Sequence, residues 1–172
     1  MTSSSTHGAG AGAKVYKPPQ EVPDPLEGLS VFLAGSIEMG KAELWQDKLT
    51  ERLRDLPITI LNPRRDGWDS TWEQRKSNPE FAYQVKWELD CQRRADVIAM
   101  YFSPDTKSPI TLMELGLFAS TGKLLVCCPD GFWRKGNVEI VCEEQKIPLT
   151  ECWKDFVDQL VDKLKSLMHS QS

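Results

Sequence analysis

The residues that most often hold a metal ion are scarce or badly spaced in this chain of 172 residues. It has only two histidines, His7 and His169, both in terminal regions, and none of its five cysteines has the CxxC spacing of a zinc site. We therefore expect no metal and no cofactor. Cys127 and Cys128 adjoin within an apolar run, which favours buried free thiols over disulfides and indicates a reducing compartment.

The sequence also lacks an apolar run long enough to span a membrane and a hydrophobic signal core at its N-terminus. Its net charge of −4 argues against general binding to nucleic acids or membrane surfaces. The chain does have 40% hydrophobic and 27% charged residues, which suffice for one globular domain of ordinary size. We therefore expect a soluble, cytoplasmic, single-domain protein.

The N-terminal region has a composition unlike the rest. Residues 1 to about 14 are rich in Ser, Thr, Gly and Ala, and residues 17–25 contain four prolines. Such a segment cannot bury enough apolar surface to offset the entropy lost on ordering. We expect a flexible tail over residues 1–27 and a catalytic domain over residues 28–170.

Beyond the tail, short apolar runs alternate with amphipathic segments, a pattern typical of parallel strands and their covering helices. This alternation predicts an α/β fold: a flavodoxin-like or Rossmann-like parallel sheet with helices on both faces. The expected strands are residues 30–34, 58–61, 96–102 and 124–128, and the expected helices are 41–53, 79–94, 111–121 and 150–168, with a short helix or strand at 138–142.

The most informative carboxylate is Glu114, in the segment ITLMELG that follows the expected strand 96–102. Ligands of open α/β sheets bind beyond the carboxyl ends of the strands, where helix N-termini present free N–H groups. A glutamate placed there is available to a ligand. Thr111 and Glu114 also fit a capping box, in which Glu114 only satisfies a backbone N–H.

A second segment runs from Gly35 to Ala42 and has the GxxxxGK spacing of a phosphate-binding P-loop. The match fails at Ala42, where a hydroxyl should hold magnesium, and Glu38 opposes an anion. Two other interpretations remain: the backbone N–H groups and the Ser36 hydroxyl bind a sugar or phosphate oxygen, or the turn simply requires Gly35. The chain has no GxSxG nucleophile motif.

Two acidic residues, Glu88 and Asp90, lie near the end of the expected helix 79–94, where the helix dipole disfavours them. Their unfavourable position in the helix suggests a functional role, although charged residues on a helix usually form a solvated face. Asp96 is expected to cap the turn into its strand.

A polar loop after the expected strand 58–61 carries Arg64, Arg65, Trp68 and Trp72. Aromatic rings and guanidinium planes stack well on nucleobases. We expect the loop to contact a base, with one of the two tryptophans folded against the core.

Five segments in order resemble the nucleoside 2-deoxyribosyltransferase family, and most of all its 2-deoxyribosyltransferase-like branch. The resemblance covers residues 29 to about 142, and the same superfamily holds N-glycosidases that hydrolyse nucleoside 5′-monophosphates. The segments are VFLAGSI at 31–37, NPRR at 62–65, QVKWE at 84–88, ADVI at 95–98 and ITLMELG at 110–116.

The resemblance implies that Glu114 is the nucleophile and that Gly35 and Ser36 line the sugar end of the site. Glu88 occupies a position where many relatives have an aspartate that handles the nucleobase, and Asp90 is an alternative. Five further residues are implied in substrate binding, Asn137 by reaching a neighbouring subunit's sugar: Ile37, Ser108, Thr111, Met113 and Asn137.

These residues predict an enzyme that cleaves or exchanges the N-glycosidic bond of a (deoxy)nucleoside through a covalent glycosyl-enzyme. The partners expected are a nucleoside or nucleoside monophosphate and a free nucleobase, with no nucleic-acid polymer and no membrane. The resemblance also implies a homodimer or higher homo-oligomer. The alternatives are a nucleoside 5′-monophosphate N-glycosidase, a non-catalytic nucleotide-binding module and a magnesium-dependent P-loop kinase.

Overall fold

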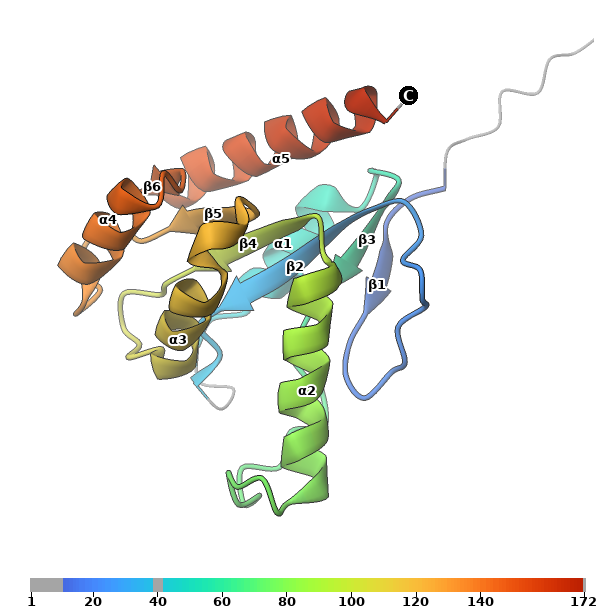
Figure 1. Cartoon of the computed structure of the whole chain (residues 1–172), viewed down its shortest axis with the longest axis vertical. Helices are drawn as coiled ribbons and strands as arrows, with labels where there is room; N and C mark the ends of the chain where they lie inside the picture. Colours follow the sequence, from blue (N-terminus) through green and yellow to red (C-terminus); the bar gives the residue numbers. More distant parts are fainter. Residues whose placement is uncertain (1–10, 39–41, 172) are drawn as a thin grey trace, which may run out of the picture.

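The computed structural model describes residues 11–38 and 42–171, and places a six-stranded parallel sheet at the centre of the molecule (Figure 1). The strand order is β1-β3-β2-β4-β5-β6, and every neighbouring pair is parallel. The strands are β1 Lys14–Tyr16, β2 Leu29–Gly35, β3 Ile58–Leu61, β4 Val97–Tyr101, β5 Leu124–Cys127 and β6 Leu149–Thr150.

Helices cover both faces of the sheet. One core cluster packs α1 and α5 against the sheet, and a second packs α2, α3 and α4 against the opposite face (Figure 1). The bounds are α1 Trp45–Leu53, α2 Pro79–Arg94, α3 Pro109–Phe118, α4 Lys135–Glu144 and α5 Trp153–Ser170, with a 3₁₀ turn at Ala119–Thr121 after α3. None of the described helices is long and apolar enough to cross a membrane.

The α/β fold predicted from the sequence is confirmed. Without β1, the strand order is 2-1-3-4-5, the flavodoxin-like order, so the direction of winding reverses between β2 and β4. Strand β2 shows why its sequence is a continuous apolar run: Val31 and Leu33 face one core cluster, while Phe32 faces the other. A strand buried on both faces has no polar alternation.

The prediction of a flexible tail over residues 1–27 is wrong for its later part. Residues 14–16 form β1, an edge strand in which Val15 pairs with Ile60 of β3. The segment that follows lies along α2, where Trp87 Nε1 donates to the carbonyl of Gln20 at 2.9 Å. Proline fits here because an edge segment leaves backbone N–H groups free of a sheet ladder. Residues 1–10 lie outside the described residues.

Other boundaries moved for local reasons. Helix α1 begins at Trp45, four residues later than expected, because residues 42–44 form part of the turn from β2. Residues 138–142, expected to form a short helix or strand, lie within α4. The 3₁₀ turn after α3 ends at Gly122, whose positive φ of 73° stops it as expected. Cys91, Cys127, Cys128 and Cys142 are buried free thiols, and Cys152 is exposed.

Candidate functional site

The carboxyl ends of β2 and β4 meet at the point where the sheet reverses its winding, and the candidate site is built there. Gly35 ends β2 so close to β4 that a Cβ atom would collide with the Tyr101 carbonyl and lie 2.7 Å from the Trp45 ring. The close approach of β4 therefore requires Gly35, as one interpretation of the turn proposed. It also brings Ser36 over the end of β4.

Ser36 stands at the centre of a cluster of buried hydroxyl groups. Its Oγ accepts from the backbone N–H of Ser103 at 2.9 Å and lies 2.9 Å from Thr106 Oγ1 and 2.5 Å from Ser108 Oγ. All four residues are at most 8% exposed. The β4–α3 loop is thereby fixed to the end of β2 by polar contacts, which bring the hydroxyls of Ser36 and Ser108 together.

A cavity of about 480 Å³ opens beside this cluster. Glu38 forms part of its wall and accepts from two backbone N–H groups just before α3, those of Lys107 at 2.9 Å and Ser108 at 2.6 Å. On the same wall Tyr101 donates its hydroxyl to Glu43 at 3.0 Å. The cavity is therefore lined by carboxylates and hydroxyl groups. The P-loop-like residues 39–41 lie outside the described residues.

Two carboxyl side chains approach each other between α2 and α3. Glu114 of α3 is 6% exposed and accepts from Gln92 Nε2 at 3.0 Å. Glu88 of α2 accepts from Gln84 Nε2 at 2.7 Å. Gln84, Glu88 and Gln92 are spaced by four residues, so they form one row along α2. Each carboxyl is thus held by an amide from the same row.

The two carboxyls have raised pKa values, and the charge of Glu88 contributes to that of Glu114. Burial raises the pKa of Glu114 to about 8, the negative charge of Glu88 adds to this, and the hydrogen bond from Gln92 opposes it. Burial raises the pKa of Glu88 to about 7 against the opposing hydrogen bond from Gln84. The charge of an ionised Glu88 therefore disfavours ionisation of Glu114, and the pKa values of both carboxyls lie above the ordinary glutamate value of 4.5.

The capping-box interpretation of Glu114 is wrong. Helix α3 begins at Pro109, so Thr111 lies in its first turn and Glu114 in its second. Thr111 is buried at 3% exposure, and the Glu114 carboxyl receives its hydrogen bond from the side chain of Gln92 rather than from a backbone N–H. The prediction failed because the sequence pattern placed the start of the helix two residues too late.

The structure also separates the neighbouring acids. Asp90 is exposed and forms an ion pair with Arg94 at 3.0 Å, so it points away from Glu114 and is not part of the carboxyl pair. Asp96 accepts from the backbone N–H of Ser30 at 2.8 Å and from the Ser30 hydroxyl at 3.0 Å. This cap ties the start of β4 to β2, as expected.

Arg64, expected at the substrate, is instead buried beneath the β2–α1 turn. Its Nη1 donates to the carbonyl of Glu43 at 2.9 Å and its Nη2 to that of Ala42 at 2.8 Å. Burial lowers the pKa of this guanidinium. Arg64 thus holds the turn that carries the cavity wall, and the sequence could not show this because both partners are backbone atoms.

The other residues of the loop between β3 and α2 form a cluster near the start of α2. Trp68 and Trp72 are both partly buried and pack edge to face, with ring centroids 5.2 Å apart. We expected one of them to pack against the core, but neither belongs to a core cluster. Arg65 lies 4.7 Å above the Trp72 ring and forms an ion pair with Glu80 at 3.2 Å.

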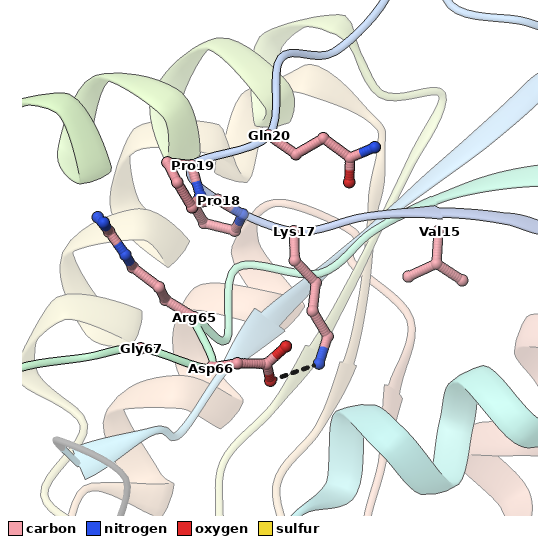
Figure 2. A pocket seen from close by; sticks show the side chains of 8 residues that line it. All are labelled: Val15, Lys17, Pro18, Pro19, Gln20, Arg65, Asp66 and Gly67. Atoms are coloured by element: carbon pink, nitrogen blue, oxygen red, sulfur yellow. Dashed lines mark hydrogen bonds and ion pairs between the residues drawn. The ribbon is translucent and has the colours of Figure 1, made fainter.

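A second cavity, of about 600 Å³, lies between this loop and the segment after β1. Figure 2 shows Lys17 pointing toward Asp66, with which it forms an ion pair at 2.9 Å, whereas Arg65 points away from both. The cations of this cavity are thus matched by acids of the same protein.

The remaining predicted residues lie at the surface or beside the hydroxyl cluster. Ile37 is partly buried directly after Ser36, Met113 is 51% exposed on α3, and Asn137 is exposed in the first turn of α4.

The sequence analysis did not identify Gln84 and Gln92, although their spacing of four residues on either side of Glu88 was a usable signal. Among the described residues, no group of three or more metal-ligating side chains comes together.

Comparison with known proteins decides the family. The model described as "Nucleoside 2-deoxyribosyltransferase like" matches residues 28–132, which is more than half of the chain. The chain belongs to the nucleoside 2-deoxyribosyltransferase-like family. The match contains Gly35, Ser36, Glu88 and Glu114, so the hydroxyl cluster and the carboxyl pair both lie within the family region.

Solved structures agree on the fold of this deoxyribosyltransferase-like protein. The crystal structure of a conserved protein from Enterococcus faecalis V583 has a TM-score of 0.55 and 13% identity to it, covering 78% of this chain and 98% of that one. A likeness at this identity shows the fold alone. A search of curated proteins finds no significant sequence match.

Proposed function

We propose that this deoxyribosyltransferase-like protein cleaves the N-glycosidic bond of nucleosides with the carboxyl pair Glu88 and Glu114. The observation that carries the proposal is the pair itself: the buried Glu114 of α3 and the partly buried Glu88 of α2, with pKa values raised to about 8 and about 7. Glycosidic cleavage needs one carboxylate and one carboxylic acid, and a pair of carboxyls with raised pKa values supplies both when one of them is protonated.

In this mechanism the ionised Glu114 attacks C1′ of the sugar. A bond forms between C1′ and the carboxylate oxygen, while the bond between C1′ and the base nitrogen breaks and its electrons leave with the base. Neutral Glu88 donates its proton to the departing base. A second base or water then attacks C1′, and Glu88 accepts the proton that this nucleophile releases, which restores Glu114.

The amides support this division of roles. Gln92 donates to Glu114, and Gln84 donates to Glu88 and also to the carbonyl of Pro63 at 3.0 Å. Because Gln84 is tied to the backbone, it fixes the position of Glu88. A base nitrogen that accepts a hydrogen bond from Glu88 favours protonation of Glu88 over protonation of Glu114. Ionised Glu114 then faces the sugar.

A chromatographic assay tests the proposal directly. Purified protein, free of added metal, is incubated with a panel of nucleosides and 5′-monophosphates, each with and without a second free base. Release of free base without an acceptor means hydrolysis, and a new nucleoside formed only with an added base means transfer. Failure to convert any substrate would refute the proposal.

Glu88→Gln should lower kcat about 10²- to 10³-fold, because the departing base then receives no proton. The matched control is Asp90→Asn, two residues away on the same helix, where the exposed carboxylate contacts Arg94. We expect this control to retain kcat within about twofold. Steady-state rates on the best nucleoside of the panel distinguish the two variants. Equal losses would place Asp90 in the mechanism and contradict the assignment.

We also propose that the protein is a homo-oligomer that buries the outer face of α3. Ile110, Met113 and Leu117 are each more than half exposed and recur at helical spacing beside Glu114. A helix that is apolar on every side is normally covered on every side. A second copy covering this stripe would bring another surface next to the carboxyl pair.

Met113→Glu should convert this oligomer into monomers and lower activity with it, because a charge in an apolar interface is costly to bury. Sedimentation velocity measures the assembly. Leu44→Glu, which alters an equally exposed aliphatic residue before α1, is the control and should leave the assembly intact. A wild-type protein that sediments as a monomer would contradict this part of the proposal.

A further inference from the structure

The side-chain amide of Gln92 donates a hydrogen bond to the Glu114 carboxyl across the contact between α2 and α3. Nε2 of Gln92 lies 3.0 Å from Oε1 of Glu114. Both side chains are buried, with exposed fractions of 0% for Gln92 and 6% for Glu114, so the contact lies away from bulk solvent. A hydrogen bond in such surroundings is electrostatically stronger than one in water.

The Gln92 amide is held in one orientation. Besides the hydrogen bond to Glu114, its Nε2 donates to the backbone carbonyl of Glu88 at 3.3 Å. Turning the amide over would place Oε1 against that carbonyl oxygen, and two acceptors form no hydrogen bond with each other. Gln92 therefore presents an N–H to Glu114 rather than an oxygen.

Packing alone does not call for an amide at this position. Oε1 of Gln92 is buried and has no hydrogen-bond partner among the residues that the structure describes. A buried acceptor in this state is unfavourable, and an apolar side chain of the same length would fill the space without it. The N–H that points at Glu114 is the part of the side chain that offsets this cost.

The hydrogen bond opposes the two effects that keep Glu114 protonated. Burial and the charge of Glu88 raise the pKa of Glu114 to about 8, whereas the N–H of Gln92 lowers it. Burial raises the pKa of Cys91, which lies near Glu88 on α2, to about 12, so this thiol stays uncharged at neutral pH. A hydrogen bond to an ionised carboxylate is charge-assisted and about twice as strong as a neutral one. Gln92 thus favours the ionised form of Glu114.

We propose that Gln92 is a positioning residue that keeps Glu114 ionised and fixed in place for its attack on C1′. The proposal rests on the proposed function and deepens it, because the ionised carboxylate is the form that bonds to C1′. Gln92 acts through Glu114 and needs no contact with the substrate. Without its N–H, a larger share of the protein carries a protonated Glu114 at neutral pH.

Two substitutions remove the N–H contact in different ways. Gln92→Met keeps the length of the side chain and fills the same space without a donor. Gln92→Asn keeps the amide but is shorter by one methylene, so its N–H stops short of Glu114. Should one of these variants not fold, the other carries the test. Gln84→Met is the matched comparison, because it removes the amide that donates to Glu88 from the same row of α2.

Carbon-13 NMR of the Glu114 carboxyl, assigned with Glu114→Gln, measures ionisation without any turnover. The titration midpoint should rise by about one pH unit in both Gln92 variants. It should not rise in Gln84→Met, because Glu88 is no more ionised there than in the wild type. An unchanged midpoint in the Gln92 variants would overturn the proposal even for an active enzyme. If no substrate is converted, the proposed function fails while this titration still decides the effect of Gln92 on Glu114.

The pH dependence of kcat/KM on the best nucleoside separates this role from a purely structural one. Gln92→Met should lose about tenfold relative to the wild type at pH 7 and less than about threefold at pH 9, because the higher pH ionises Glu114 in both proteins. A packing defect would instead lower kcat/KM by the same factor at both pH values, and that result would contradict the proposal.

Discussion

Replacing Glu114 by glutamine should lower kcat for glycosidic cleavage by at least about 10⁴-fold. The amide cannot form the bond to C1′ that the carboxylate forms. The substitution is nearly isosteric, and its side-chain oxygen can still accept from Gln92, as the carboxyl does at 3.0 Å. The loss would therefore reflect chemistry rather than packing.

A substrate analogue distinguishes loss of the nucleophile from loss of the acid. With a nucleoside whose leaving group departs without protonation, Glu88→Gln should recover a rapid first turnover and accumulate a glycosyl-enzyme. Glu114→Gln should form no such adduct. Mass spectrometry of the intact protein detects the bound sugar. An adduct on the Glu114→Gln variant, or one mapped to Glu88, would reverse the two assignments.

Glu114→Gln should also stabilise the folded protein at alkaline pH. The folded-state pKa values of Glu88 and Glu114, about 7 and about 8, lie above the ordinary value of 4.5. As pH rises above 4.5, the unfolded chain releases these protons first, so it binds fewer protons than the folded protein does. The free energy of unfolding therefore falls as pH rises from about 4.5 to about 8, and levels off above that.

At pH 9, Glu114→Gln should exceed the wild type in free energy of unfolding by about 2 to 4 kcal/mol, because the amide needs no ionisation in a buried site. At pH 4.5 the two proteins should be nearly equal. Urea unfolding across this range measures both values. Asp90→Asn, at an exposed ion pair, should follow the wild type at every pH. A wild type more stable at pH 9 than at pH 5 would contradict the raised pKa values of the two carboxyls.

The fold was largely predictable because its signals are local. Strand β3 and helix α2 lie at the residues expected, since an apolar run buried on both faces and a proline at the start of a helix are readable in the chain. Gly122 ended its turn as expected. β1 was missed because three residues of an edge strand carry no periodicity, and only pairing with β3 defines them.

The candidate site was only partly predictable. Glu114 and Glu88 were named from their segments, but local sequence could not choose between Glu88 and Asp90, which are two residues apart on a helix. The difference between them is one of direction: the rotation of α2 turns Glu88 toward α3 and leaves Asp90 with Arg94. Arg64 was misplaced for a related reason, since its partners are carbonyl groups of a distant turn.

The sequence by itself determined the parallel α/β architecture, the family, and the segments that supply the carboxylates and the Gly-Ser turn. Patterns of burial and turn residues are properties of neighbouring positions, and these persist in the linear chain. Only the tertiary structure decided which side chains face one another: the effect of the Glu88 charge on Glu114, and the hydrogen bonds that Glu38 accepts from the N–H groups of Lys107 and Ser108, 69 and 70 residues away. Desolvation and hydrogen bonding depend on distances between atoms, and folding sets those distances.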